Sequence, residues 1–268
     1  MTIKLPWSSA LQKLLPTSPG EQPYVVENDN GKSLYFDARN VQSRMRNDAP
    51  HDLQLGYTRT MMGFLLLQPL PLDILIVGLG GGSLTKYCHR HLPEATITTV
   101  EINSAVIALR EQFAIPADSK KFRIICADAA HYLKGKTAIA DVILLDGFVD
   151  YGLPPTLSDQ LFYDNCYNAL RNGGVLVANL WAKDATLQRC REFIGQRFAN
   201  RILTAGAESS KNVIAFALKN PRLPAWPELQ RRAQQLQRET GLNFSTFLDE
   251  MRGSRHLRNG PARWLTEG

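Results

Sequence analysis

The chain has 268 residues, 44% of them hydrophobic, which is enough for one sizeable domain with its own core and some appendages. The net charge of +6 is uneven: residues 219–268 hold nine Lys and Arg against five Asp and Glu, so the charge does not mark the main domain as a nucleic-acid binder. The longest apolar stretch, 61–77, is broken by Gln68, Pro69, Pro71 and Asp73, which excludes a transmembrane helix there.

Residues 1–70 are predicted to form a hairpin followed by a helix. The hairpin lies between Tyr24 and Arg46 and turns at Asn30-Gly31, because Asn-Gly between alternating apolar residues is a strong turn signal. A helix is expected over about 53–67. The first residues lack the apolar core of a signal peptide.

A buried strand and a glycine cluster open the central region. Residues 74–77 form a β-branched-rich run without alternation, as expected of a parallel strand that is buried on both faces. The glycines that follow permit close backbone approach, and they are Gly78, Gly80, Gly81 and Gly82. A helix over 83–91 would direct its N-terminus towards a ligand above these glycines.

Acidic residues follow the next three predicted strands. The strands span 96–100, 122–126 and 141–145, and the acids are Glu101, Asp128 and Asp146. Open α/β sheets bind ligands at the carboxyl ends of their strands, so these acids should share one crevice. They would supply a ribose anchor, an acceptor for the adenine amine and an acid for chemistry. The alternative is that such acids only cap the following helices.

Strand, glycine turn, helix and acid together indicate a nucleoside site. A dinucleotide fold would place a third glycine where Ser83 stands, and the glycine cluster is not followed by the Gly-Lys-Ser/Thr of a P-loop. A dehydrogenase is therefore the least favoured class. The predicted fold is α/β, a Rossmann-like doubly wound sheet that is mostly parallel and closes with antiparallel strands at 201–204 and 212–218.

The chain divides into three regions. Residues 1–70 are the hairpin and helix, residues 71–220 the nucleoside-binding domain, and residues 221–268 a Pro-rich connector and basic helical extension. The extension should contain a helix over 228–240 that stops at Gly241. Its apolar stripe should pack on its own domain or on a dimer partner.

The central region resembles the spermidine synthase (polyamine aminopropyltransferase) family and the spermidine-synthase-like proteins around it. The matching segments are LIVGLGGGSL (75–84), TTVEIN (98–103), CADAAHYL (126–133), DVILLDG (141–147), LFYDNCYNALRNGGVLVANLW (161–181), NVIAFAL (212–218) and, upstream, GKSLYFDARNVQSRM (31–45). The resemblance implies the class I S-adenosylmethionine-dependent transferase fold and a homodimer. It also places Tyr57 on the family's active-site tyrosine.

This chain departs from the family pattern at several positions. Gly81 stands where the family has an aspartate that holds the amine of decarboxylated S-adenosylmethionine. Tyr57 is followed by Thr-Arg instead of His or Gln and then Glu, and in the loop that begins at Asp146 the second acid, Asp150, is displaced by one residue. The stretch 179–181 replaces a glutamate that helps to bind polyamine. Because buried polyamine cations need paired carboxylates, these losses disfavour decarboxylated donor and polyamine.

We therefore expect a transferase with a sulfonium adenosine donor, either S-adenosylmethionine or its decarboxylated form. Methyl transfer to a small amine-type acceptor is slightly favoured, and aminopropyl transfer is the close alternative. A third possibility is a non-catalytic nucleoside-binding scaffold. Asp146 would accept or steer the acceptor's proton with Tyr57 as hydrogen-bonding helper, Glu101 would bind ribose and Asp128 the adenine amine.

The acceptor itself is not revealed by the sequence. Candidate acceptor-pocket residues are Asp150, Tyr151 and Trp181, although large residues at strand ends could equally belong to the core. We expect no metal, because His89 and His91 point to different helix faces. Scattered cysteines without a Cys-x-x-Cys pair predict a reduced, cytoplasmic protein, and neither a membrane nor a nucleic acid is an expected partner.

Overall fold

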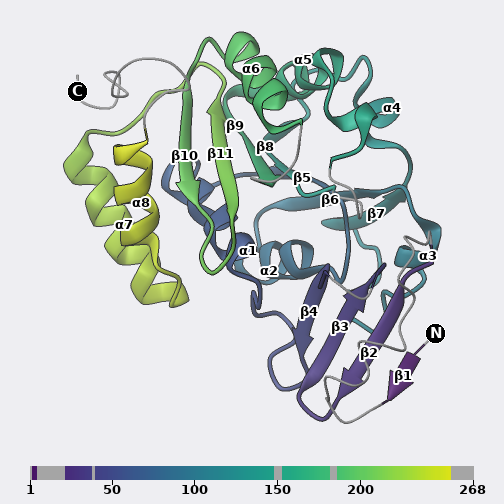
Figure 1. Ribbon diagram of the computed structural model, residues 1–268. Helices are drawn as coiled ribbons and strands as arrows, with labels where there is room; N and C mark the ends of the chain where they lie inside the picture. Colours follow the sequence, from purple (N-terminus) through teal and green to yellow (C-terminus); the bar gives the residue numbers. More distant parts are fainter. Residues whose placement is uncertain (1, 5–21, 38–39, 148–152, 182–185, 255–268) are drawn as a thin grey trace.

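The computed structural model describes residues 2–4, 22–37, 40–147, 153–181 and 186–254 (Figure 1). Its centre is a seven-stranded sheet with the order β10-β11-β9-β8-β5-β6-β7. The strands are β5 (Asp73–Val77), β6 (Thr96–Glu101), β7 (Phe122–Cys126), β8 (Ala140–Leu145), β9 (Leu170–Trp181), β10 (Ile202–Gly206) and β11 (Asn212–Leu218). Strands β5 to β9 pair in parallel, whereas β11 is antiparallel to both β9 and β10. The predicted doubly wound sheet with its antiparallel closing strands is confirmed.

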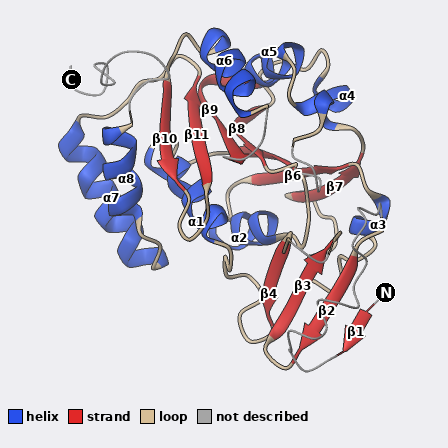
Figure 2. Ribbon diagram, viewed as in Figure 1, coloured by secondary structure: helices blue, strands red, loops and turns tan. Residues whose placement is uncertain are grey.

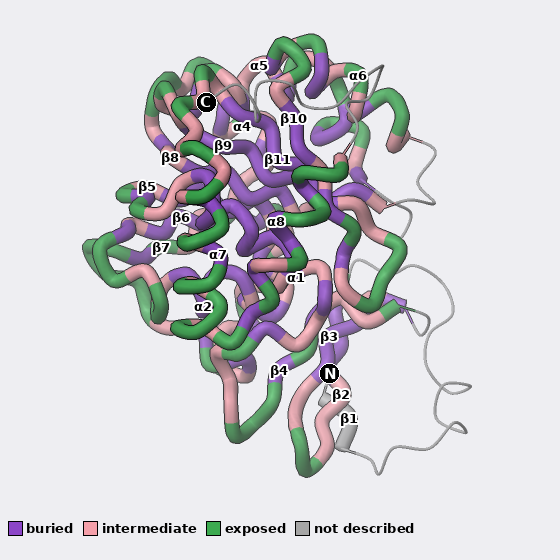
Figure 3. Tube along the Cα trace, turned by 90° about the vertical axis from the view of Figure 1, so that its left-hand side faces the viewer, coloured by how far each residue is buried: buried purple, intermediate pink, exposed green. Residues whose placement is uncertain are grey.

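Helices cover both faces of this sheet (Figure 2). On one face lie α1 (Gly56–Met61), the 3₁₀ helix η2 (Met62–Leu66), α2 (Ser83–His91), α3 (Ser104–Ile107), α7 (Trp226–Thr240) and α8 (Phe244–Gly253). On the other lie α4 (Ala129–Leu133), η3 (Pro155–Leu157), α5 (Gln160–Ala169) and α6 (Leu187–Arg197). Side chains alternate along β5 accordingly: Ile74 and Ile76 enter the first core, and Leu75 and Val77 enter the second. The strands β5, β6 and β8 in the middle of the sheet are largely buried, whereas the edge strand β7 buries only Phe122 (Figure 3).

A smaller sheet precedes the central one. It contains β1 (Thr2–Lys4), β2 (Tyr24–Asn28), β3 (Gly31–Tyr35) and β4 (Ser43–Arg46), with β1 parallel to β2 and the others antiparallel. The hairpin was predicted correctly, but its turn is one residue earlier than Asn30-Gly31. Asn28 and Gly31 are paired, and Asn28 Oδ1 accepts hydrogen bonds from the amides of Asn30 and Gly31, both at 3.0 Å.

Gly31 is needed for close packing, not for the turn. A Cβ at this position would lie 2.1 Å from the backbone oxygen of Met45 on β4. The helix predicted over 53–67 is also corrected, since it begins at Gly56 and changes to a 3₁₀ helix at Met62. The pattern of apolar residues does not show where the α-helix ends and the 3₁₀ helix begins.

The C-terminal helices belong to the same core as the sheet. The predicted stripe on α7 is buried through Leu229 and Ala233, and α8 buries four apolar side chains, Phe244, Phe247, Leu248 and Met251. Arg232 Nη1 donates to the backbone oxygen of Leu66 at 2.7 Å. Helix α7 ends at Gly241 in a left-handed conformation, with φ of 73°. Helix α8 was not anticipated. In the part of the chain that the structure describes, no helix combines the length and apolarity that crossing a bilayer requires.

Candidate active site

A cavity of about 1140 Å³ opens at the carboxyl ends of the central strands. It lies between the end of the small sheet, the start of α1, the glycine turn after β5 and the tip of the β10–β11 hairpin. Its lining contains most of the predicted site residues, namely Tyr57, Gly78, Gly80, Glu101, Asp128, Asp146 and Trp181. The three strand-end acids, Glu101, Asp128 and Asp146, thus line one cavity, as the sequence predicted.

The glycine turn forms one wall of the cavity. Gly78 has φ of 95° and approaches β8 so closely that a Cβ would lie 2.3 Å from the backbone oxygen of Asp146. Gly78 and Gly80 line the cavity, whereas Gly81 and Gly82 do not appear among its lining residues. A Cβ on Gly81 would lie 2.7 Å from Ser43 Oγ and 2.8 Å from Phe113 Cδ1. Gly81 and Gly82 are thus packed closely behind this wall, and their expected contact with the cofactor stays a prediction.

Glu101 is fixed to the glycine turn by backbone hydrogen bonds. Its Oε2 accepts from the amide of Leu79 and its Oε1 from the amide of Asn103, both at 2.8 Å. The residue is 9% exposed, and it ends β6 next to β5. Each carboxylate oxygen keeps a second acceptor position, so the pair can receive two hydroxyl groups from a ligand such as a ribose diol.

Asp128 caps helix α4 as well as lining the cavity. Its Oδ1 accepts from the amides of Ala130 at 2.7 Å and His131 at 3.2 Å. The capping alternative is therefore realised for this residue. Oδ2 makes neither of these two bonds, so an acceptor for an adenine amine is compatible with the cap.

Asp146, at the end of β8, is the centre of a side-chain network. Tyr57 Oη donates to its Oδ2 at 3.1 Å, and Asn179 Nδ2 donates to its Oδ1 at 2.8 Å. Asn212 Nδ2 in turn donates to Asn179 Oδ1 at 2.8 Å. The sequence reasoning paired Asp146 with Tyr57 but missed both asparagines. A signal for Asn179 was its place near the carboxyl end of β9, but this residue was interpreted only as part of the stretch 179–181 that replaces a glutamate.

Burial determines the proton affinity of this network. It raises the pKa of Asp146 from 3.8 to about 6, against the opposing effect of the hydrogen bonds from Asn179 and Tyr57. Burial, followed by the charge of Asp146, also raises the pKa of Tyr57 well above 10.0. At neutral pH Tyr57 is therefore a neutral donor and Asp146 a carboxylate of increased basicity, which is suited to accept a proton.

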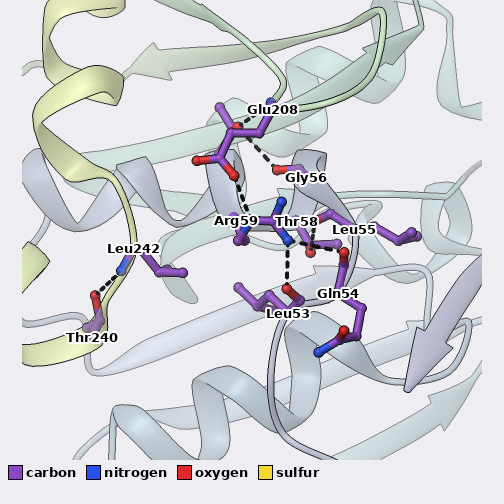
Figure 4. A network of polar contacts seen from close by, with 10 residues as sticks. Leu53, Gln54, Leu55, Gly56, Thr58, Arg59, Glu208, Thr240 and Leu242 are labelled. Carbon is purple, nitrogen blue, oxygen red and sulfur yellow. Dashed lines mark hydrogen bonds and ion pairs between the residues drawn. The ribbon is translucent and has the colours of Figure 1, made fainter. Parts of the chain in front are cut away.

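A second network holds the β10–β11 hairpin against α1 (Figure 4). Arg59 Nε donates to Glu208 Oε2 at 2.6 Å, and Arg59 Nη1 donates to the backbone oxygens of Leu53 and Gln54. The amide of Glu208 donates to Thr60 Oγ1 at 3.2 Å. Arg59, which departs from the family pattern, thus has a structural partner at the edge of the cavity.

Three predicted acceptor residues have different outcomes. Trp181, at the end of β9, is half-buried and lines the cavity. Asp150 and Tyr151 lie outside the described residues, so their assignment stays a prediction. Among the residues that are described, no three His, Cys, Asp or Glu side chains gather in a group that could hold a metal ion.

Comparison with known proteins gives consistent matches. Residues 54–219 match the family model described as "Spermine/spermidine synthase domain". The chain is 37% identical over 247 residues to the polyamine aminopropyltransferase of Neisseria meningitidis serogroup A, covering 91% of this chain and 94% of that protein. It is 33% identical over 187 residues to the mouse eEF1A lysine and N-terminal methyltransferase, covering 65% of this chain and 26% of that protein.

A solved structure gives the same fold. Human Methyltransferase-like protein 13 in complex with SAH aligns with a TM-score of 0.61 and 27% identity, covering 75% of this chain and 95% of that one. The class I methyltransferase type expected for the central sheet is confirmed by this likeness.

Proposed function

The chain belongs to the spermine/spermidine synthase family and is a transferase of the S-adenosylmethionine type, and we propose that it transfers an aminopropyl group from decarboxylated S-adenosylmethionine to a small amine. The observation that carries an alkyl transfer to an amine is Asp146, a half-buried carboxylate of raised pKa held between Tyr57 and Asn179 beside the glycine turn. The choice of aminopropyl over methyl is supported by near full-length similarity to a polyamine aminopropyltransferase.

The proposed reaction is an in-line displacement at the carbon attached to the sulfonium. The lone pair of the neutral acceptor amine forms the new N–C bond while the C–S bond breaks, and its electron pair leaves with sulfur as a neutral thioether. The nitrogen then carries an extra proton, which passes to the carboxylate of Asp146. The donor is already activated by its positive sulfur, so the protein's contribution is positioning and acceptance of this proton.

The donor is proposed to lie against the glycine turn. Glu101 would accept hydrogen bonds from the two ribose hydroxyls while its bonds to the amides of Leu79 and Asn103 hold it in place. Asp128 would accept a hydrogen bond from the adenine amine through Oδ2. Each assignment uses carboxylate lone pairs that remain after the backbone bonds are made.

Methyl transfer from intact S-adenosylmethionine is the second candidate, and the surroundings of Gly81 favour it. The family resemblance places the aspartate for the decarboxylated donor's amine at this position. The structure leaves little space for any side chain here, because a Cβ would come within 2.8 Å of the ring of Phe113, which is fully buried. The sequence analysis ranked methyl transfer first for a related reason, but the relatives support the aminopropyl alternative more strongly.

The thioether that leaves identifies the transferred group, whichever amine accepts it. We would incubate the protein with each donor and a series of α,ω-diamines, and separate the products by liquid chromatography and mass spectrometry. Decarboxylated donor should yield methylthioadenosine together with an acceptor that is heavier by one aminopropyl group. S-adenosylhomocysteine formed from intact donor, with no methylthioadenosine from the other, would establish methyl transfer instead.

A matched pair of variants separates catalysis from contamination and misfolding. Asp146→Asn should lower product formation by about 10²–10⁴-fold. Asp159→Asn should leave it unchanged, because Asp159 is an exposed N-cap of α5 outside the cavity, and asparagine caps a helix equally well. Product formed equally by both variants would mean that Asp146 does not serve the reaction.

A further inference from the structure

A line of hydrogen-bonded side chains reaches Asp146 from the edge of the cavity. Asn212 donates to Asn179, and Asn179 donates to Asp146, each at 2.8 Å. In the antiparallel register of β9 and β11, Asn212 lies opposite Trp181 and Asn179 lies opposite Ile214. The two amides are therefore diagonal neighbours on one face of the strand pair, which is within reach for side chains of this length.

The direction of this line is fixed by chemistry. A side-chain amide has one accepting end and one donating end, whereas a carboxylate only accepts. If Asn179 were turned over, its oxygen would face Asp146 and its amino group would face the amino group of Asn212, so both contacts would be lost. The carboxylate of Asp146 thus sets the direction of the line, and the bond from Asn212 to the Asn179 oxygen holds the Asn179 amide in the orientation that donates to Asp146.

The hairpin that carries Asn212 is itself fastened to α1. Arg59 and Glu208 form an ion pair in which the side chains are 27% and 28% exposed (Figure 4). Gly56 and Glu208 also approach so closely that a Cβ on Gly56 would lie 1.6 Å from the backbone oxygen of Glu208. Because α1 carries Tyr57, one hairpin is linked to both hydrogen-bond partners of Asp146.

We propose that Asn212 is a positioning residue, which acts through Asn179 to keep Asp146 an unprotonated acceptor aimed at the incoming amine. This inference rests on the proposed function, since it assigns Asn212 to the same proton transfer. Asn212 need not touch the substrate. Its effect is to hold the side-chain amide of Asn179 with its amino group towards Asp146.

Other ionisable groups near the network are accounted for. The titratable side chain in contact with Asp146 is Tyr57 from α1, and Asn179 from β9 is neutral. The remaining charged residues of the described cavity lining are Arg44, Glu101 and Asp128. Asn212→Leu and Asn179→Ala leave all of these charges unchanged, so a shift in the titration of Asp146 in these two variants reports on the asparagine pair.

The test reads the protonation of Asp146 directly, without turnover. Protein labelled with ¹³C at aspartate carboxyl groups would be titrated by NMR, and the Asp146 signal would be assigned by its loss in Asp146→Asn. In Asn212→Leu, which has similar size and no amide, the titration midpoint should rise by about one pH unit, the size expected for one lost hydrogen bond. Asn212→Asp should raise it further, because a second carboxylate repels the charge on Asp146 and competes with it for the amino group of Asn179.

Two further comparisons test whether Asn212 acts on Asp146 only through Asn179. Asn179→Ala should shift the midpoint as Asn212→Leu does, and combining the two should add nothing, because Asn212 acts only through Asn179. Asn220→Asp is the matched control: Asn220 donates to Asn172 at 3.1 Å in a similar amide pair, exposed and outside the cavity. This control should leave the midpoint unchanged.

The proposal would be overturned by an unchanged midpoint in Asn212→Leu or by additive shifts in the double variant. If Asn212→Leu lowers the yield of folded protein, Asn212→Val replaces it, since valine suits a strand and also lacks the donor. With the substrates established, the acid limb of kcat/KM should move by the same amount as the NMR midpoint. Absence of any transfer activity would count against the proposed function and leave the titration result standing.

Discussion

The two ends of the cavity differ in what holds their polar side chains. At the glycine turn, Glu101 and Asp128 accept hydrogen bonds from backbone amides that are 2, 3 or 22 residues away in sequence. Around Asp146, the bonds run between side chains whose positions differ by 33 and 89 residues, and the Arg59–Glu208 pair spans 149. The first end is largely a product of local chain geometry, whereas the second exists only once the sheet is assembled.

This difference predicts that the two ends respond differently to substitution. Losing a side-chain partner around Asp146 should disturb chemistry while the donor still binds. A change at Glu101 should disturb donor binding and the turn together. The following predictions test this division, beginning with the largest effect.

Replacing Asp146 with asparagine should cost the most activity. The variant loses the proposed proton acceptor, and we expect turnover to fall by about 10²–10⁴-fold. Donor affinity, measured by calorimetry, should remain close to that of the parent because the glycine turn is untouched. A variant that turned over normally would return Asp146 to the role of a strand-end residue with no part in the reaction.

Glu101→Gln should weaken donor binding, by roughly tenfold to a hundredfold, as expected for lost hydrogen bonds to a charged group. One end of the amide would also face a backbone N–H that needs an acceptor, so the turn itself should loosen. Asp128→Asn should have a smaller effect, because asparagine retains the α4 cap. Calorimetry on both variants measures the two losses in donor affinity. Equal losses would contradict the expectation that Glu101→Gln has the larger effect.

The raised pKa of Asp146 also predicts a dependence of stability on pH. Ionisation of Asp146 costs free energy in the folded state, where its pKa is about 6 against 3.8 for an ordinary Asp. Its contribution to stability is therefore fully present below about pH 4 and lost as the pH rises through about 6. Asp146→Asn should be more stable than the parent at pH 7.5, by about 1–3 kcal/mol, and this advantage should disappear at pH 4.

Urea denaturation at the two pH values measures this difference. Asp159→Asn should show no such pH-dependent gain, since Asp159 is exposed. A gain for Asp146→Asn that persisted unchanged at pH 4 would mean that the substitution acts by packing and not by charge.

Breaking the Arg59–Glu208 pair should have the smallest effect. The pair is partly exposed, so its removal by Glu208→Gln is worth about 0.2–1 kcal/mol, or up to roughly fivefold in kcat/KM for the acceptor. Donor affinity should not change, because the pair lies at the other end of the cavity. Steady-state kinetics with each substrate varied in turn would show this. A loss in donor affinity as large as the loss in kcat/KM for the acceptor would contradict the proposed difference between the two ends of the cavity.

The same division explains what the sequence predicted well. The strand–glycine–helix pattern is a local feature of the sequence. The backbone amides that bind Glu101 and Asp128 also lie within 22 residues of these acids in the chain. The doubly wound sheet likewise follows from alternating strand and helix signals. The partners Asn179 and Asn212 could not be found in this way, because only the register of β9 against β11 brings them together.

Two local errors have the same origin. The Asn30-Gly31 dipeptide was interpreted as a turn, but the glycine is required by the neighbouring strand β4, which is distant in sequence from the turn itself. Helix α8 was not anticipated because its apolar residues are recognisable as a buried face only when η2 and β10 are placed beneath them. Contacts with other elements explain both the requirement for a glycine at position 31 and the burial of α8, whereas the turn itself is held locally by Asn28.

The position of α8 also closes one side of the central sheet. Strand β10 is the outermost strand, and its outer backbone groups would ordinarily be open to pairing with another chain. Helix α8 packs along β10, and Glu250 Oε2 accepts a hydrogen bond from the amide of Gly206 at 2.5 Å. The C-terminal extension therefore occupies the outward backbone donor of Gly206, so at this position the edge strand cannot donate to a strand of another chain.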